Sequence, residues 1–180
     1  MSKVRRKGDD VVVTLTPEER QLLASLATAI CTLLERDGDT VDDDPLAALV
    51  GMSSEPVVAP DDPVLRRLLP DAYGDPELAA EFRQLTDADL RARKTSALRR
   101  VLDDVTGDDT VALDEDEGVG MWVQGINDIR LVLGTRLDVT EDWTDSFDTL
   151  PPDDPRIPLY LFYDWLSSLQ DALVRAAMRG

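Results

Sequence analysis

The stretch MWVQGINDIRLVL at residues 121–133 predicts a buried helix. Its apolar residues cover most of the circumference of a helix, and a helix that is apolar nearly all round is usually buried at the centre of a protein. Gly134 follows this stretch and is predicted to end the helix. The sequence therefore predicts a central helix against which the other helices pack.

Apolar residues at helical spacing predict further helices on both sides of this stretch. Thr16, Pro17 and Glu19 combine a capping residue, a proline at the first helical position and an acidic residue three positions after the cap, which is typical of a helix start. The helix that they begin runs to about Arg36. The other predicted helices span residues 63–69, residues 76–85, a segment from a second capping signal at Thr86 to about Val105, and residues 157–178.

Two short stretches with β-forming residues, Val11–Leu15 and Thr110–Leu113, each lead into a capping residue and an acidic first helical turn. We expect these strands to pair, with Val13 near Val111. The alternative is that any two helix starts look alike. An isolated two-stranded ribbon is marginally stable in water, so it should lie against the helices. The predicted fold class is mainly α, a compact bundle of about six helices with one small two-stranded ribbon.

Length and composition predict a single helical domain over residues 11–180. The basic sequence MSKVRRKGDD at residues 1–10 leads into no apolar segment of a targeting signal, and we expect a disordered basic N-terminal tail there. Acidic stretches that contain proline, near residues 37–62 and 138–155, are predicted to be loops. A short apolar piece at Leu46–Val50 interrupts the first of them.

The charge balance favours a protein partner over nucleic acid. The chain has 37 acidic and 19 basic residues, which give a net charge of −18. Binding to DNA requires a basic surface that neutralises phosphates, so direct DNA binding is disfavoured, whereas an acidic surface can attract a basic protein surface. We expect the partner to contact the more acidic second half of the chain, first of all residues 103–117 and 138–154.

Absent residues and motifs exclude the commonest classes of enzyme. The chain has no histidine, and it lacks the GxGxxG, GxxxxGK[ST] and GxSxG motifs. We therefore expect no catalytic activity, no cofactor and no metal site, with a carboxylate-based site of an unfamiliar kind as the alternative. No apolar run is long enough to cross a bilayer, so we expect a cytoplasmic protein without a membrane span.

Cys31 is the only cysteine, so these 180 residues cannot form an intramolecular disulfide. Helical spacing places Cys31 on the buried side of the first predicted helix, among leucine and isoleucine side chains. A redox-sensing thiol is usually exposed and lies near a positive charge or a second cysteine. Cys31 is the one redox candidate of the chain, but its position favours the role of a core residue.

Polar residues on the central helix need partners, because leaving a buried charge unpaired costs about 3–5 kcal/mol. We expect an ion pair between Arg130 and Asp164 that joins the central helix to the last helix. The alternative is that both side chains reach water separately. Asp128 and Arg136 must likewise be paired or solvated.

Two motifs stand out, NDIRLVLGTRL at residues 127–137 and YDWL at residues 163–166. With the longer segments 65–94, 126–142 and 163–174, they resemble an actinobacterial family catalogued as a domain of unknown function, which includes AosR-like oxidative-stress transcriptional regulators. The motif residues could act as structural elements or as partner contacts. They are Asn127, Asp128, Arg130, Gly134, Thr135, Arg136, Tyr163, Asp164 and Trp165.

The resemblance implies a cytoplasmic regulator that senses oxidant through cysteine oxidation and acts on transcription through a sigma factor or RNA polymerase. This chain departs from that expectation, because one cysteine cannot make an intramolecular bridge. Either Cys31 pairs between chains, or the protein regulates without disulfide chemistry. The alternative function is a non-transcriptional adaptor, for example in protein turnover. The sequence does not determine the oligomeric state.

Overall fold

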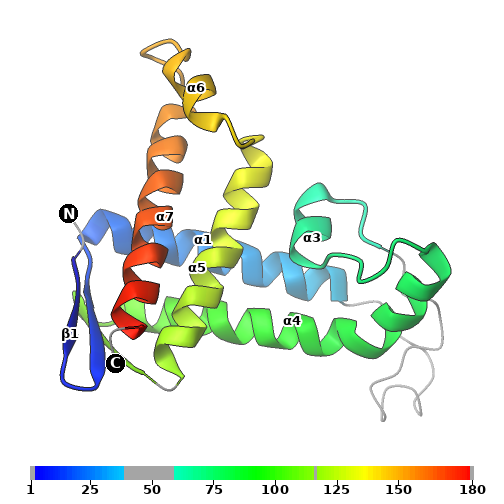
Figure 1. Cartoon of the computed structure of the whole chain (residues 1–180), viewed down its shortest axis with the longest axis horizontal. Helices are drawn as coiled ribbons and strands as arrows, with labels where there is room; N and C mark the ends of the chain where they lie inside the picture. The colour runs from blue at the N-terminus through cyan, green and yellow to red at the C-terminus, as the bar shows by residue number, and fades with distance from the viewer. Residues whose placement is uncertain (1–2, 39–58, 116, 179–180) are drawn as a thin grey trace.

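The computed structural model describes residues 3–38, 59–115 and 117–178. The chain is mainly helical, with a small antiparallel sheet at one end (Figure 1). The predicted apolar piece at Leu46–Val50 and most of the predicted loop at 37–62 lie outside the described residues. In chain order the elements are β1 (Lys3–Lys7), β2 (Asp10–Thr14), α1 (Pro17–Gly38), α3 (Pro63–Leu68), α4 (Pro76–Thr106), β3 (Thr110–Asp114), α5 (Gly118–Arg136), α6 (Trp143–Asp148) and α7 (Ile157–Ala177).

The central helix predicted from residues 121–133 is confirmed as α5, which contacts α3, α4 and α7 (Figure 1). Trp122, Ile126 and Ile129 are completely buried along this helix. Gly125 allows α4 to approach closely, because a β-carbon at this position would lie 2.9 Å from Cγ2 of Val101. α5 therefore supplies much of the core of the bundle.

Capping residues start the outer helices where the sequence predicts. At the start of α1, Oγ1 of Thr16 accepts a hydrogen bond from the Glu19 amide at 3.3 Å, and the Glu19 carboxylate accepts one from the Thr16 amide at 2.8 Å. This reciprocal pair is a capping box. Asp62 and Asp75 cap α3 and α4 through their side chains, in agreement with the two Asp-Pro pairs.

The region predicted as two helices, residues 76–85 and Thr86 to about Val105, is one continuous helix, α4. The second capping signal is wrong because Oγ1 of Thr86 donates to the carbonyl oxygen of Phe82 at 2.9 Å, inside the helix. Such a bond often bends a helix, and α4 bends near its first turns in Figure 1. α4 runs along most of the length of the molecule (Figure 1).

The two predicted strands pair, and a third strand completes an antiparallel sheet of order β1-β2-β3. β2 and β3 place Val13 opposite Val111, as expected. Val11 and Val13 of the middle strand are completely buried in the core. The predicted two-stranded ribbon is therefore part of a three-stranded sheet.

β1 corrects the prediction of a disordered tail over residues 1–10. Val4 of this strand packs against the core. Arg6, on the same side of the strand, donates to the Glu115 carboxylate at 2.6 Å and to the carbonyl oxygen of Ala176 at 3.3 Å. The other three residues of β1 are basic and exposed. Their charge concealed the strand in the sequence, because a run of basic residues is also typical of a solvated tail.

Asp138, and not Gly134, marks the end of α5. The helix continues to Arg136, so Gly134 lies inside its last turn. Asp138 has a φ of 53°, and the Val139 amide donates to the carbonyl oxygen of Gly134 at 2.8 Å. This is the Schellman arrangement, which usually has glycine at the left-handed position. The chain then forms the short α6 inside the region predicted as a loop at 138–155.

Replacing Asp138 by glycine is expected to raise the free energy of unfolding by about 0.5–1 kcal/mol, because glycine adopts the left-handed conformation without strain. The change also removes a negative charge from the negative end of the α5 dipole. Urea unfolding measures the effect. Asp138→Asn removes the charge alone and should give a smaller gain. A loss of stability in Asp138→Gly would contradict this account of the helix end.

Candidate functional site

The motif residues of α5 and α7 hold these two helices together. Arg130 donates from Nε to Oγ of Ser167 at 3.0 Å and from Nη1 to Oε1 of Gln170 at 2.6 Å. Its guanidinium carbon lies 5.4 Å from the ring centre of Tyr163. The predicted ion pair between Arg130 and Asp164 is therefore wrong. Residues 163, 167 and 170 share one face of α7, whereas Asp164 is exposed on another.

Asp128 links α5 to α4. Its side chain is 1% exposed, and Oδ1 accepts a hydrogen bond from Nζ of Lys94 at 2.6 Å. Oδ2 is buried without a hydrogen-bond partner. Burial raises the pKa of Asp128, and the ammonium group of Lys94 opposes that rise. The sequence predicted that Asp128 needs a partner, but it did not indicate Lys94, because spacing does not tell which helices face each other.

The remaining motif residues of α5 and α7 differ in burial and in contacts. A β-carbon at Gly134 would lie 3.4 Å from Cε2 of Tyr163, so the aromatic ring of α7 packs directly over this position of α5. Thr135 donates to the carbonyl oxygen of Leu131 at 2.8 Å within the helix. Asn127 and Trp165 are half-buried, and Arg136 and Asp164 are exposed.

Aromatic residues pack α6 onto the start of α7. The ring of Trp143 stacks on Tyr160 with 5.9 Å between ring centres, and it meets Tyr163 edge-on at 5.7 Å. The hydroxyl of Tyr160 donates to the carbonyl oxygen of Leu137 at 2.8 Å, which ties α7 to the end of α5. Of the motif residues, Arg130, Gly134 and Tyr163 have contacts that build the α5–α6–α7 part of the fold.

Cys31 lies on the buried side of α1, with a relative exposure of 7%. Burial raises the pKa of its thiol, and the neighbouring Glu35 carboxylate adds to that rise, while Arg99 opposes it. Arg99 donates to Glu35 at 2.6 Å, so its positive charge is partly neutralised there. A raised pKa reduces the thiolate fraction, and the thiolate is the species that reacts with oxidants.

Cys31 in the native protein is expected to react with a thiol reagent at least about tenfold more slowly than in urea, because the thiol is buried and its pKa is raised. Absorbance of the dye released from a disulfide reagent measures both rates. Thr32→Cys in a Cys31→Ala background is the matched control, since residue 32 is exposed on the same turn of α1. Equal rates for the two native thiols would contradict burial of Cys31.

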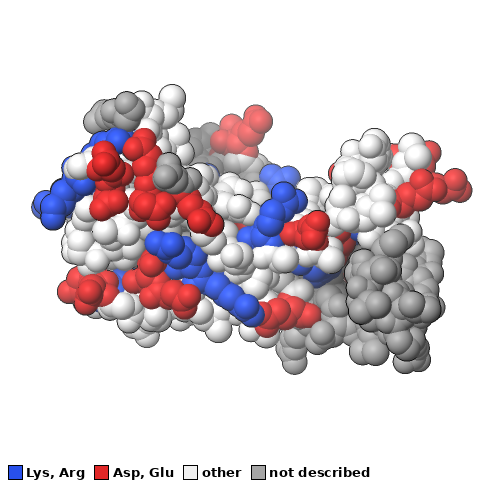
Figure 2. All heavy atoms as spheres, turned by 90° about the horizontal axis from the view of Figure 1, so that it is seen from below, with Lys and Arg blue, Asp and Glu red and all other residues white. Residues whose placement is uncertain are grey.

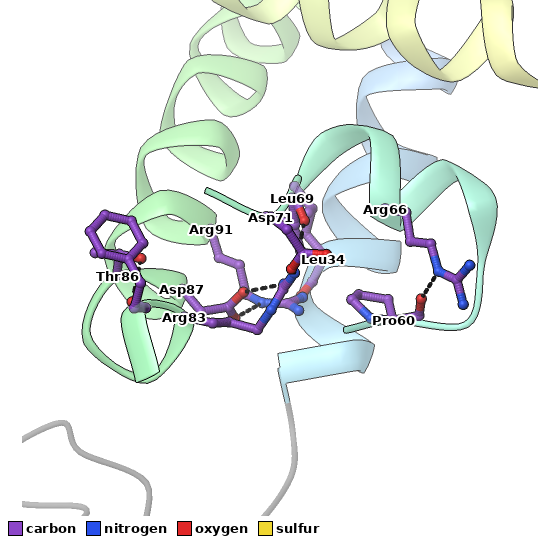
Figure 3. Close-up of polar contacts among 10 residues, drawn as sticks. Leu34, Pro60, Arg66, Leu69, Asp71, Arg83, Thr86, Asp87 and Arg91 are labelled. Carbon is purple, nitrogen blue, oxygen red and sulfur yellow. Dashed lines mark hydrogen bonds and ion pairs between the residues drawn. The ribbon is translucent and has the colours of Figure 1, made fainter. Parts of the chain in front are cut away.

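Arginine and aspartate side chains anchor the first part of α4 to its neighbours (Figure 3). Nη2 of Arg83 donates to Asp71 at 2.6 Å, and Nη1 of Arg83 lies 3.5 Å from the Asp87 carboxylate. Arg91 also pairs with Asp87, and its Nη1 donates to the carbonyl oxygen of Leu34 on α1 at 3.0 Å. The spacing of residues 83, 87 and 91 by four could have predicted this ladder.

A groove of about 710 Å³ runs between α1, α4 and the start of α5. The three arginines along it are paired with acids: Arg91 with Asp87, Arg99 with Glu35, and Arg100 with Asp104. Its other lining residues include Ala88, Ala92 and Ser96 of α4. Within residues 3–38, 59–115 and 117–178, no group of three His, Cys, Asp or Glu residues is placed to hold a metal ion.

An exposed apolar stripe lies on the first part of α4. Leu78, Phe82 and Leu85 are 51%, 41% and 67% exposed, and Tyr73, just before the helix, is 50% exposed. The rings of Tyr73 and Phe82 meet edge-on at 5.6 Å. We call these four residues the α4 stripe. The sequence contained its signal, since residues 78, 82 and 85 repeat at helical spacing, but it did not indicate that this face points to solvent.

The two acidic segments expected to form one contact surface lie far apart. Residues 103–117 end where α5 begins, and residues 138–154 start where it ends. A 19-residue helix is about 28 Å long, so the two segments lie at opposite ends of α5 (Figure 1). On the face shown in Figure 2, basic side chains alternate with acidic ones and form no broad basic surface.

The family of the chain follows from a comparison of whole sequences. The model of the family described as "Domain of unknown function (DUF2017)" matches residues 1–177. The chain belongs to the DUF2017 family. The resemblance of the motifs at residues 127–137 and 163–166 to such a family is therefore confirmed. No solved structure matches this DUF2017 chain.

Curated relatives of the DUF2017 chain carry a functional name. It is 29% identical over 187 residues to a Mycobacterium bovis protein named oxidative stress regulator AosR, and the match covers 96% of this chain and 84% of the relative. It is 30% identical over 178 residues to a putative oxidative stress regulator AosR of Mycobacterium leprae, with coverages of 91% and 81%. Among the described residues, no helix is long and apolar enough to span a bilayer.

Proposed function

We propose that this DUF2017 chain is a cytoplasmic oxidative-stress regulator that acts on transcription by binding a sigma factor or RNA polymerase, without catalytic activity of its own. The observation that carries the proposal is the similarity to proteins named oxidative stress regulator, which extends over 96% of the chain. A match over nearly the whole chain favours a shared role for the whole domain.

Charge and surface chemistry support a protein partner over DNA. The net charge of −18 repels a polyanion, and the face in Figure 2 has no basic ridge that could follow a duplex. The α4 stripe, in contrast, exposes large apolar side chains of the kind that protein interfaces bury. These features support a regulator that works by protein contact.

The single buried thiol supports regulation without an internal disulfide. Cys31 has no second cysteine to pair with in these 180 residues, and its raised pKa disfavours oxidation. We therefore expect Cys31→Ala to bind the same partner as the wild-type chain, before and after peroxide treatment. On this proposal, the oxidant acts on the partner protein, or it changes the amount of this chain in the cell.

Affinity capture from an actinobacterial lysate tests the proposal. The tagged chain should recover RNA polymerase subunits or a sigma factor, and an unrelated protein of similar net charge should not, because binding requires more than charge. Reproducible absence of these proteins, both with and without peroxide, would contradict the proposal. Recovery of protease or chaperone subunits in their place would favour the adaptor function.

A further inference from the structure

The first part of α4 has a buried face and a separate exposed apolar face, and only the buried face is used in the fold. Its inner face contains the buried residues Ala79 and Arg83, and the salt bridges in Figure 3 anchor that side. The α4 stripe lies on the other side, where Leu78, Phe82 and Leu85 point to solvent. A helix that only covers a core needs no apolar residues on its outer side, so this exposed face requires a different explanation.

The geometry of the α4 stripe matches a helix-docking surface. Residues 78, 82 and 85 follow the i, i+4, i+7 spacing by which one helix presents anchors to another. They extend over about 10 Å along α4, or two turns. Tyr73 widens the stripe on one side through its edge-on contact with Phe82. The anchored inner face holds the stripe in place, which lowers the entropic cost of docking.

The charges around the α4 stripe select the kind of helix that fits. The exposed ionisable residues of the segment 71–92 are acidic: Asp71, Asp75, Glu77, Glu81 and Asp89. The next residue, Arg93, is an exposed cation about 12 Å along α4 from Leu85. The two basic residues of the segment, Arg83 and Arg91, have side chains that are 7% and 12% exposed and are paired with Asp87. The stripe is therefore apolar with an anionic rim.

We propose that the α4 stripe is the docking site for an amphipathic helix of a partner polypeptide, one that has lysine or arginine beside its apolar residues. The anionic rim attracts such a helix and repels a second copy of the same face, a nucleic acid or an anionic membrane. This inference rests on the proposed function in one respect, namely that the chain works through a polypeptide partner.

A peptide titration tests the docking site. The probe is a fluorescent 18-residue peptide that has leucine at i, i+3, i+4 and i+7 spacing with lysine between the leucines. The full chain should bind it, and Leu78→Ser/Leu85→Ser should weaken binding at least about tenfold, because central apolar anchors dominate such interfaces. The matched control is Leu159→Ser/Leu161→Ser on α7, where the two leucines are 41% and 57% exposed, and it should bind like the wild-type chain.

Charge variants test the selectivity for a basic helix. The same peptide with glutamate in place of lysine should not bind the wild-type chain. Glu77→Lys/Glu81→Lys should weaken binding of the lysine peptide and reduce its dependence on salt, because the rim then loses two attracting charges and gains two repelling ones. Circular dichroism should show unchanged folding in all variants, since every substituted side chain is exposed.

Several results would overturn the inference. Equal binding of the lysine peptide by the wild-type chain and by Leu78→Ser/Leu85→Ser would show that the peptide binds outside the α4 stripe. Absence of binding to the wild-type chain would exclude the proposed site. Sedimentation that shows a dimer lost in Leu78→Ser/Leu85→Ser would assign the α4 stripe to a second copy.

If the lysate capture recovers a transcription protein equally with this variant, the inference fails and the proposed function stands. If the peptide binds at the stripe but no transcription protein is captured, the proposed function fails instead.

Discussion

Replacing Lys94 by methionine is expected to lower the free energy of unfolding by about 3–5 kcal/mol, because the change leaves the Asp128 carboxylate buried without its partner. Asp128 is almost fully buried, and Oδ2 already has no hydrogen-bond partner. Oδ1 accepts a 2.6 Å hydrogen bond from Nζ of Lys94. Methionine keeps the length and apolar stem of the side chain, so the loss reports the charge and not the packing.

The destabilisation of Lys94→Met should depend on pH. Burial raises the pKa of Asp128, and removing Lys94 removes the group that opposes this rise. The folded variant then binds a proton more tightly than the unfolded chain does. Its free energy of unfolding should therefore fall as the pH rises from the unfolded pKa of Asp128 to the raised folded pKa. Urea unfolding of Lys94→Met and wild type between pH 4 and pH 8 measures this difference.

The double variant Lys94→Met/Asp128→Leu is the control. It removes both charges and fills their space with apolar atoms, so its stability should return to within about 1 kcal/mol of the wild-type value or exceed it. A single variant Lys94→Met that loses less than about 1 kcal/mol at neutral pH would contradict the importance of the α4–α5 pair.

Trp122→Ala should also cost about 3–5 kcal/mol, because it empties the largest fully buried side-chain position of the described residues. The indole lies on α5, and Nε1 donates to Oδ2 of Asp104 on α4 at 2.8 Å. The same oxygen accepts a hydrogen bond from Arg100 at 2.8 Å. The variant therefore loses packing and one of the bonds that join α4 to α5. Urea unfolding followed by far-UV circular dichroism gives the value.

Trp165→Ala provides the comparison for Trp122→Ala. The Trp165 ring stacks on Phe162 with 4.9 Å between ring centres, and it is only half-buried. Its removal opens a smaller cavity, so the loss of stability should be clearly smaller. Equal losses in the two variants would show that α5 is not the centre of the core.

Short sequence patterns predicted the helices, the helix starts and the strands that are determined by residues close together in the chain. The apolar stretch at 121–133 predicted α5, and Thr16 with Glu19 predicted the start of α1. The strands around Val13 and Val111 pair as expected because each has the β-branched residues of a buried strand. Each of these signals is contained within a few consecutive residues.

Apart from the strand pairing, contacts between side chains of distant segments could not be predicted in the same way. Asp128 needed a partner by its burial, but Lys94 is one of several cations on α4, and only the packing of α4 on α5 selects it. Arg130 was assigned to Asp164, whereas its side chain faces Ser167 on the neighbouring face of α7. Neighbouring residues of α7 point in different directions, and sequence spacing does not show which of them faces Arg130.

The α4 stripe was missed for a related reason. Apolar residues on a helix are expected to face the core, and Leu78, Phe82 and Leu85 have the right spacing for that. The structure turns the face of Ala79 and Arg83 inward instead, because Arg83 has acceptors there in Asp71 and the carbonyl oxygen of Leu69. Tertiary partners therefore determined which of the two faces became the surface.

We propose that this acidic chain regulates by binding a protein of the transcription machinery and not by binding DNA. The most direct measurement is a fluorescence anisotropy titration of the chain, labelled at its amino terminus, with purified actinobacterial RNA polymerase, with purified sigma factors and with duplex DNA. The account predicts saturable binding to the polymerase or to a sigma factor that persists when duplex is added, and no binding to duplex alone at low salt. Salt-dependent binding to duplex without binding to either protein would contradict it.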